Sequence, residues 1–193
     1  MNTEIAPFIH ELARVEDGAT VGAGTRVWAQ AHVRSGARIG AGCVIGTGVT
    51  VDTDVTIGDR CKVQNSALLY RGLHLGNGVF VGPAAVFTND RAPRAVTPDG
   101  DLRSERDWTV VETHVDDGAS IGANATVVAG LRIGAWSMVA AGAVVTRDVP
   151  AHALVAGVPA RRIAWVCACG ERTERGGDIT CAACGRRFSV ESA

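Results

Sequence analysis

Four cysteines near the C-terminus have the spacing of a metal site. Cys167 and Cys169 form a C-x-C pair, and Cys181 and Cys184 form a C-x2-C pair after eleven intervening residues. Each pair is followed by glycine, and four thiolates complete the tetrahedral shell that structural zinc prefers. The first pair is one residue shorter than the usual knuckle. The spacing predicts a structural zinc in a zinc-ribbon-like module over residues 166–193, with disulfides as the alternative.

The balance of charges disfavours polyanionic partners. The 193 residues include 19 Lys and Arg against 20 Asp and Glu, which gives a net charge of −1. The N-terminal segment lacks the basic start and the apolar run of a signal peptide, and no apolar stretch reaches the roughly 18 residues of a membrane helix. We therefore expect a cytoplasmic protein that binds neither nucleic acid nor a membrane.

A six-residue period predicts the elements that must position any site. Every sixth residue from Val15 to Phe87 is apolar, thirteen in succession, and the period restarts at Val115. Gly or Asp often follows the apolar residue, and a small residue such as Cys43 recurs four positions after it. The period fits neither an α-helix nor one long strand. Three short strands joined by bends, however, would return each apolar residue to the interior of an 18-residue coil. The chain is therefore expected to be an all-β solenoid.

A long insertion interrupts this period. The interval from Phe87 to Val115 is not a multiple of six, so a loop over residues 88–114 must leave the solenoid. Long insertions in compact domains are usually functional or disordered, and a solenoid presents its insertions on one face. We expect residues 1–165 to form the solenoid domain, with this extruded loop as part of its functional site.

The repeat of an aliphatic residue, Gly or an acidic residue, two free positions, a small residue and one free position resembles the hexapeptide-repeat acyltransferases. Three blocks resemble more narrowly the nucleotide-sugar 3-N-acetyltransferases, namely VFVGPAAVFTNDRAPRA, GASIGANATVVAG and AAGAVVTRDVPAHALVAGVPARRIAWVCACG. The resemblance implies a left-handed parallel β-helix, a homotrimer, and acetyl transfer from acetyl-CoA to the amino group of a UDP- or dTDP-linked 3-amino sugar. An O-acetyltransferase of the same fold, acting on a hydroxyl, is the nearest alternative.

This resemblance also suggests the catalytic residues. Asn89 belongs to the FTN segment, which faces the acceptor amine in those enzymes, so its amide would orient the amine by accepting a hydrogen bond. A turn asparagine that bonds its own backbone is the alternative. His114 closes the loop where some O-acetyltransferases of this fold hold a general base. The 3-N-acetyltransferases tend to lack a histidine there, which leaves its role open.

Counting by coils stacks four polar residues in one column that ends beside Asn89. Arg34 and Tyr70 of this column are candidates for binding the acceptor, and Arg94 of the loop is a candidate for its diphosphate, whose oxygens suit a guanidinium fork. Solvent-facing side chains without a role are the alternative for each. The four residues of the column are Arg34, Asp52, Tyr70 and Thr88.

The later repeats are expected to hold acetyl-CoA. Glycines there would leave room for the pantetheine arm, and arginines would meet the phosphates. The resembling enzymes carry basic residues at the matching positions in TRDVP and GVPAR. The candidates are Gly122, Gly134, Gly142, Arg147 and Arg161.

Two further readings are disfavoured by spacing and charge. A β-helix carbonic anhydrase usually has an H-x4-H pair, and none of the five histidines shows that spacing. A ribbon that docks nucleic acid or protein would need a clearer basic and aromatic surface than the mixed charges around Phe188 provide.

Overall fold

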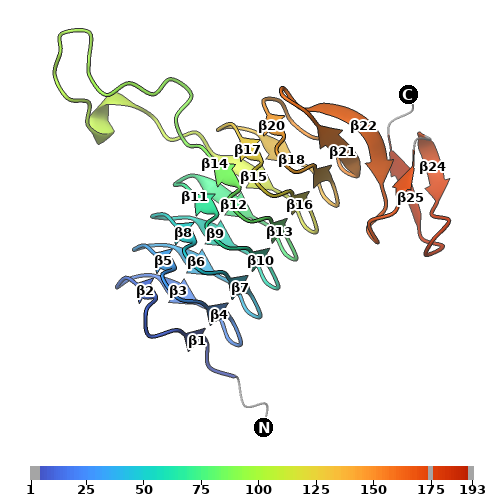
Figure 1. Cartoon of the computed structure of the whole chain (residues 1–193), viewed down its shortest axis with the longest axis horizontal. Helices are drawn as coiled ribbons and strands as arrows, with labels where there is room; N and C mark the ends of the chain where they lie inside the picture. Colours follow the sequence, from blue (N-terminus) through green and yellow to red (C-terminus); the bar gives the residue numbers. More distant parts are fainter. Residues whose placement is uncertain (1–4, 174–175, 191–193) are drawn as a thin grey trace.

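A computed structural model of the chain describes residues 5–173 and 176–190. These residues form a parallel β-helix that rises from the N-terminal end, with one long loop at its side and a small module at its C-terminal end (Figure 1). The predicted fold, an all-β left-handed parallel β-helix with an extruded loop, is confirmed. None of the helices in the described part of the chain is long and apolar enough to cross a bilayer.

The strands are short because each hexapeptide allows only a few extended residues before the next corner. Paired residues are 18 positions apart, as for Val27 opposite Ile45 and Ile45 opposite Val63. Three sheets result, one for each side of the coil. The first sheet contains β1 (Phe8–Ile9), β4 (Arg26–Val27), β7 (Val44–Ile45), β10 (Lys62–Val63), β13 (Phe80–Val81), β16 (Ser120–Ile121), β19 (Met138–Val139), β21 (Ala153–Ala156), β22 (Arg161–Val166) and β23 (Arg172–Thr173).

The second and third sheets repeat the same parallel pairing. The second contains β2 (Arg14–Val15), β5 (His32–Val33), β8 (Thr50–Val51), β11 (Leu68–Leu69), β14 (Val86–Phe87), β17 (Thr126–Val127) and β20 (Val144–Val145). The third contains β3 (Thr20–Val21), β6 (Arg38–Ile39), β9 (Thr56–Ile57), β12 (Leu73–Leu75), β15 (Thr113–Val115) and β18 (Arg132–Ile133).

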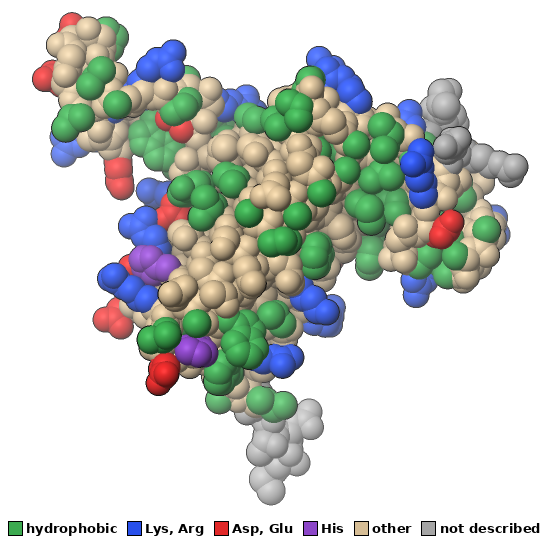
Figure 2. All heavy atoms as spheres, viewed as in Figure 1, with side chains coloured by type: hydrophobic (Ala, Val, Ile, Leu, Met, Phe, Trp, Pro, Cys, Tyr) green, Lys and Arg blue, Asp and Glu red, His purple; other side chains and the backbone are tan. Residues whose placement is uncertain are grey.

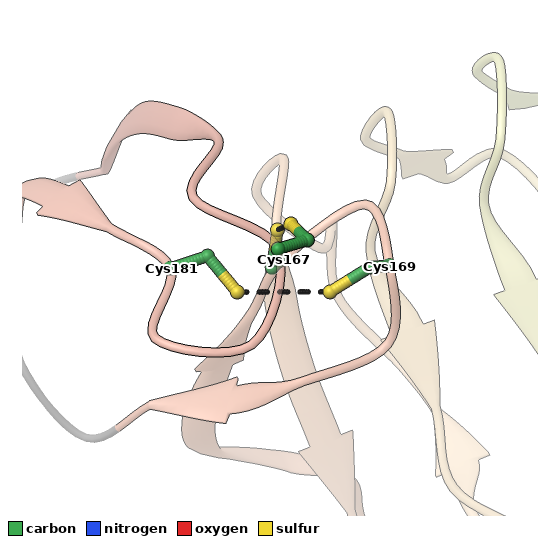
Figure 3. Close-up of side chains that lie close together, drawn as sticks. Cys167, Cys169 and Cys181 are labelled. Atoms are coloured by element: carbon green, nitrogen blue, oxygen red, sulfur yellow. Dashed lines mark hydrogen bonds between the residues drawn. The ribbon is translucent and has the colours of Figure 1, made fainter.

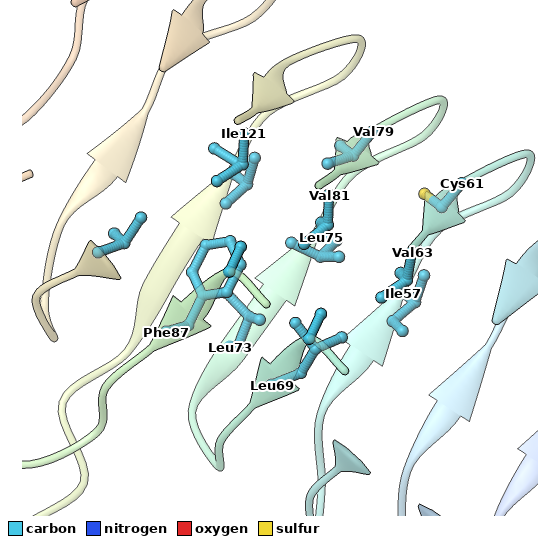
Figure 4. Packing of buried hydrophobic residues seen from close by; sticks show 14 of the residues in the cluster. Ile57, Cys61, Val63, Leu69, Leu73, Leu75, Val79, Val81, Phe87 and Ile121 are labelled. Carbon is cyan, nitrogen blue, oxygen red and sulfur yellow. The ribbon is translucent and has the colours of Figure 1, made fainter. Parts of the chain in front are cut away.

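The core is the column of apolar residues that the period predicts. The apolar residue of each repeat is the inward residue of its strand, and from Val27 onward these residues are buried. Leu69, Phe87 and Ile121 point into the same interior from different strands (Figure 4). Burying a side chain as large as Phe87, which is 1% exposed, contributes roughly 1.5–3 kcal/mol. Aliphatic stacking therefore holds the coils in register.

Two kinds of glycine serve the coil. Gly142 lies at a corner with φ +68, a conformation that glycine adopts without steric cost. Gly122 follows a strand instead, and a Cβ there would lie 2.4 Å from the backbone nitrogen of Ala141 in the next coil. The glycine that follows a strand is thus required by the close approach of neighbouring coils.

The loop is inserted between two coils without disturbing them. Val81 pairs with Ile121 across the insertion, in the same parallel register that joins strands one coil apart elsewhere in the first sheet. The loop projects from the β-helix between β14 and β15 (Figure 1). Within it, Val96 and Leu102 form an antiparallel bridge, and a short 3-10 helix, η1 (Glu105–Asp107), follows.

The C-terminal module continues the first sheet. Strand β22 pairs antiparallel with β21 and with β23, and it spans the domain boundary expected between residues 165 and 166. Its Trp165 is 1% exposed. Beyond it, β24 (Gly177–Thr180) and β25 (Arg187–Val190) form a hairpin, and Phe188 stacks on His152 of the last coil at 4.6 Å between ring centroids. The module therefore packs against the end of the stack.

Candidate active site

The predicted polar column lies beside the base of the loop. Arg34 and Asp52 are consecutive members, and the guanidinium donates to the Asp52 carboxylate at 2.5 Å. Asp52 also accepts hydrogen bonds from the backbone of Thr53 at 2.8 Å and Arg71 at 3.2 Å, so its oxygens are well occupied. Tyr70 is 37% exposed at the next coil. The structure thus offers an open phenol one coil beyond an ion pair that holds the Arg34 guanidinium.

The base of the loop is fixed on the following coil. Thr88 accepts a hydrogen bond from the backbone N–H of Ala129 at 3.0 Å, and Arg91 donates to the carbonyls of Ala129 at 2.8 Å and Gly130 at 3.0 Å. Asn89 lies between these two anchors and is half-buried. Among the described residues its amide makes no hydrogen bond. A rigid position and a free amide are what an orienting side chain needs.

The outer part of the loop is separated from this base. Arg94 is exposed and donates to the carbonyl of Pro93 at 2.8 Å. Within the described chain it forms no ion pair and no hydrogen bond with the polar column. Leu102 is 83% exposed, and hydrophobic side chains are scattered over the projecting arm (Figure 2). In the described part of the chain, Arg94 is therefore not bonded to the polar column.

At the return of the loop, two histidines and one glutamate meet. His74 and His114 are partners on β12 and β15, and their rings stack at 4.9 Å with an interplanar angle of 14°. Glu112 points its carboxylate at both, 3.2 Å from His114 Nε2 and 3.9 Å from His74 Nε2. The Nδ1 atom of His74 is hydrogen-bonded to the Thr56 hydroxyl at 2.7 Å. The two Nε2 atoms thus face one carboxylate, beside a shallow depression of about 470 Å³.

The later coils carry the residues expected to hold acetyl-CoA. Gly134 resembles Gly122, because a Cβ there would lie 2.4 Å from the backbone nitrogen of Ala151. Gly142 has open space where its side chain would be. Arg147 and Arg161 are both exposed, and Arg161 donates to the carbonyl of Ala160 at 2.9 Å. Coil packing therefore explains two of the glycines, whereas Gly142 and both arginines are open to solvent.

The four C-terminal cysteines come together as their spacing predicts. Their sulfur atoms lie within 4.8 Å of one another, with 3.6 Å between Cys167 and Cys184 and 3.6 Å between Cys169 and Cys181 (Figure 3). These separations exceed the S–S bond length of about 2.05 Å. Four thiolates at about 2.3 Å from a tetrahedral zinc would be about 3.8 Å apart. The cluster has the size of a zinc site.

Backbone hydrogen bonds shape the cysteine turns. The carbonyl of Cys167 accepts from Gly170 at 2.8 Å, and that of Cys181 accepts from Gly185 at 2.9 Å, which folds each pair into a tight turn. The backbone N–H of Cys184 is the largest influence on the Cys181 thiol, and it lowers the pKa of that thiol to about 7. Metal binding needs the deprotonated thiolate, which this turn favours at Cys181. At Cys169 the backbone N–H of Glu171 lowers the pKa, but hydrogen bonds among the thiols outweigh it and raise the pKa to about 12.

Comparisons with known proteins agree with this geometry. The bacterial transferase hexapeptide family (six repeats) matches residues 18–53 and 36–71, and the hexapeptide repeat of succinyl-transferase matches residues 113–147. Repeats of this hexapeptide type are thus recognised on both sides of the inserted loop. The expected resemblance of the chain to the nucleotide-sugar N-acetyltransferases among the hexapeptide-repeat acyltransferases is confirmed by the relatives below.

The relatives of this chain match it over part of their length. It is 47% identical over 76 residues to dTDP-3-amino-3,6-dideoxy-alpha-D-galactopyranose 3-N-acetyltransferase of Aneurinibacillus thermoaerophilus, which covers 39% of this chain and 40% of that protein. It is 41% identical over 93 residues to serine acetyltransferase 4 of Arabidopsis thaliana, which covers 47% of this chain and 25% of that protein. The matched segments thus span less than half of these relatives.

A solved structure resembles most of this chain. The crystal structure of PerB from Caulobacter crescentus, in complex with CoA and GDP-perosamine, aligns with a TM-score of 0.52 and 26% identity. The alignment covers 82% of this chain and 57% of PerB. The shared fold therefore includes a protein that binds both CoA and a nucleotide-linked amino sugar.

Sequence reasoning missed two parts of the site. Glu112 has no motif of its own, and its role depends on the contact with His74 and His114. These histidines are far apart in sequence, and only the pairing of β12 with β15 stacks them. The restart of the six-residue period at Val115 could have predicted this pairing. If the inserted residues are left out of the count, His114 falls one coil after His74. Arg91, which anchors the loop, carried no such signal.

Proposed function

We propose that the protein transfers an acetyl group from acetyl-CoA to the amino group of a nucleotide-linked sugar. The observation that carries this proposal is the 47% identity to a dTDP-3-amino-sugar 3-N-acetyltransferase. The fold shared with PerB, which binds CoA and GDP-perosamine, supports the same pair of ligands. A free asparagine amide at the fixed base of the loop fits an amine acceptor.

The chemistry requires orientation more than a strong base. The neutral amine attacks the thioester carbonyl, so a C–N bond forms and the C–S bond breaks. The nitrogen then loses one proton, which the departing CoA sulfur can take. An amine is already nucleophilic near neutral pH, whereas a hydroxyl needs its proton removed, and a positioned base typically contributes about 10²- to 10⁴-fold. Holding the amine in line with the thioester is therefore the main task of the protein.

The acceptor side of the site is assigned to the loop base and the polar column. In this proposal Asn89 accepts a hydrogen bond from the sugar amine and directs its lone pair. Arg34 and Tyr70 bind the sugar nucleotide, and the ion pair with Asp52 fixes the direction of the Arg34 guanidinium. Arg94 binds the diphosphate from the projecting arm. His114 lies at the other end of the loop and is assigned a secondary role.

The acetyl-CoA side is assigned to the later coils. Gly142, with open space at its corner, would leave room for the pantetheine arm, and Arg147 and Arg161 would meet the phosphates as exposed cations. Gly122 and Gly134 are also proposed to lie beside the pantetheine arm. The close packing of neighbouring coils is by itself sufficient to require glycine at both positions.

A homotrimer with sites between subunits completes the proposal. Arg94 makes no bond to the polar column among the described residues, and the arm that carries it exposes Val96 and Leu102 by 45% and 83%. A second copy placed against the arm would cover these side chains. It would also bring Arg94, the residue proposed to bind the diphosphate, to a site on that copy. Light scattering is expected to give three times the chain mass of 20.0 kDa; a monomer would remove this part of the proposal.

The second proposed ligand is one structural zinc bound by Cys167, Cys169, Cys181 and Cys184. The sulfur separations fit the tetrahedral shell, and four thiolates leave no coordination position open for catalysis. A cytoplasmic location, as the sequence suggests, would keep these thiols reduced and available for metal.

The test of the function compares two variants with one acceptor. A panel of UDP- and dTDP-linked amino sugars is first incubated with acetyl-CoA, and thiol release identifies the acceptor. With that sugar, Asn89→Ala is expected to lower kcat/KM more than His114→Ala. The histidine change should cost less than roughly tenfold, a barrier of about 1.4 kcal/mol. Circular dichroism confirms that both variants are folded.

The opposite ranking would favour the hydroxyl acceptor. If His114→Ala loses two or more orders of magnitude while Asn89→Ala is mild, a base-dependent mechanism replaces this one. Two observations would fit this outcome: the similarity to serine acetyltransferase 4, and the 3.2 Å contact by which Glu112 could orient His114 as a base. O-acetylation would then be the function to pursue.

A further inference from the structure

The third sheet carries a second group of side chains suited to a metal, far in sequence from the cysteines. Its outward residues on neighbouring strands are Thr56, His74 and His114, because β9, β12 and β15 pair in parallel register. Glu112 approaches from the loop. One ligand atom from each of His74, Glu112 and His114 lies within 4.8 Å of the other two. No part of the proposed acetyl transfer requires this convergence.

The orientation of His74 suits coordination through Nε2. Its Nδ1 atom is hydrogen-bonded to the Thr56 hydroxyl at 2.7 Å. If Nδ1 carries the proton and donates it to Thr56, the Nε2 lone pair is left for a metal. Such a contact from the far nitrogen fixes the tautomer of metal-binding histidines in general. Thr56 would thus position His74 for coordination without contacting the metal itself.

The separations come close to those of a metal site. Ligands at about 2.0–2.2 Å from a tetrahedral zinc ion are about 3.3–3.6 Å apart. Glu112 already lies 3.2 Å from His114 Nε2 and 3.9 Å from His74 Nε2. The three side chains are 32%, 64% and 46% exposed in the order His74, Glu112 and His114. Their partial exposure leaves them free to rotate, so that ligand atoms that now lie within 4.8 Å of one another can close on one ion.

The surrounding charge favours a cation. Asp116 and Asp117 line the same depression as the histidines. The nearest positive group in the column, Arg132, is held by Asp116 through bonds of 2.8 and 3.0 Å. Glu112 adds a third carboxylate beside the histidines, so that two carboxylates remain after Asp116 has paired with Arg132.

We propose that His74, Glu112 and His114 form a binding site for a divalent transition metal of the zinc type. Two imidazoles and one carboxylate are a donor set that binds Zn²⁺ and leaves a position open. The ion joins two coils to the return of the loop, because Glu112 lies immediately before β15. It also occupies the nitrogen that a general base at His114 would use.

Cobalt separates this site from the cysteine site. The full-length protein, freed of metal under reducing conditions, is titrated with Co²⁺ while absorbance is recorded. The thiolate site gives intense sulfur-to-cobalt charge-transfer bands, whereas a site of nitrogen and oxygen ligands gives only weak d–d bands. We expect two equivalents of Co²⁺ per chain. In Cys181→Ser the charge-transfer bands should weaken while the d–d bands of the second site remain.

Variants of the ligands test the assignment. His74→Gln and Glu112→Gln should each weaken Co²⁺ binding at the second site at least about 100-fold, since removing even an outer hydrogen bond costs about 10- to 100-fold. Thr56→Val should weaken it by that smaller factor. His32→Gln is the matched control, because His32 also faces outward and contacts a carboxylate, Glu16, at 2.7 Å, but has no second imidazole partner. It should bind Co²⁺ like the wild type.

Direct binding makes the outcome independent of acetyl transfer. If the wild type takes up cobalt only at the thiolate site, or if His74→Gln and Glu112→Gln bind as the wild type does, the proposal is wrong. The cluster would then be a hydrogen-bonded contact between the loop and the coils. Circular dichroism of each variant ensures that any loss of binding is not a loss of folding.

Discussion

The coil stack and the C-terminal module are both made of β-strands, but different interactions hold them. In the stack, aliphatic columns are buried from Val27 to Val155. In the described part of the module beyond β22, the buried residues are Cys167, Ile179 and Cys181, so two cysteines of the proposed zinc site stand where an apolar core would be. Modules with so little apolar surface commonly need a metal to fold. If different interactions hold the two regions, each should be able to lose its folded structure without the other.

The largest expected effect is loss of the module on removing zinc. Apparent binding energies of structural zinc are about 10–16 kcal/mol in zinc-finger peptides. Chelation, or Cys181→Ser, should therefore abolish the amide signals of β24 and β25 in NMR spectra while those of the stack persist. Cys43→Ala is the control, since this buried cysteine belongs to the coils and should leave the zinc content unchanged. A hairpin that survives chelation would mean that apolar contacts suffice.

The next effect is confined to the stack. Phe87→Ala should lower the free energy of unfolding of the coils by about 3–5 kcal/mol, because it leaves a cavity among buried residues. Phe80→Ala removes the same side chain from an outward position that is 38% exposed, and it should cost far less. Urea denaturation measures both. Zinc content should be unchanged in either variant; its loss in Phe87→Ala would show that the two regions fold as one unit.

A smaller effect distinguishes the two roles considered for glycine. Gly122→Ala places a Cβ 2.4 Å from the Ala141 backbone nitrogen, and such overpacking should destabilise the stack by about 1–3 kcal/mol. Gly142→Asn should be better tolerated, because Asn124 holds the equivalent corner one coil earlier with φ 55. Denaturation and acetyl-CoA binding are measured together. If Gly122→Ala weakens acetyl-CoA binding without destabilising the stack, the glycine serves the ligand and not the coil.

The smallest effect concerns the loop at acid pH. The backbone N–H and hydroxyl of Ser104 bond the Asp107 carboxylate at 2.6 and 2.9 Å and hold the pKa of Asp107 below its usual range. A lowered folded-state pKa means that this stabilisation is complete above the unfolded-state pKa and is lost as pH falls through the folded-state value. NMR shifts of η1 should therefore change in that acid range while those of the coils do not.

Asp107→Asn is the control for this titration. Asparagine keeps an acceptor oxygen but carries no titrating group, so the acid-dependent change in η1 should disappear. A change that persists in Asp107→Asn would assign the titration to another carboxylate and remove the capping contact as its cause.

The sequence alone was sufficient for the periodic and the paired features. Each apolar residue of the six-residue period is fixed by its neighbours one coil above and below, so the period determined the strands, the core and the exit of the loop after Phe87. The four cysteines were equally readable, because two close pairs with following glycines need only local turns to bring their sulfurs together.

Only the tertiary structure decided the contacts that cross coils or the inserted loop. The pairing of Arg34 with Asp52 and the joint approach of Glu112 to His74 and His114 depend on side-chain directions that the period leaves open. The insertion also hides the register, since the whole loop separates His74 from His114 in sequence although they are partners in the third sheet. The role of Gly122 needed the distance to the next coil. A repeat sequence determines the spacing within each coil, whereas a contact between repeats depends on how the coils are stacked. The roles of Asn89 and Arg94 in catalysis stay predictions because they too depend on contacts that the repeat does not determine.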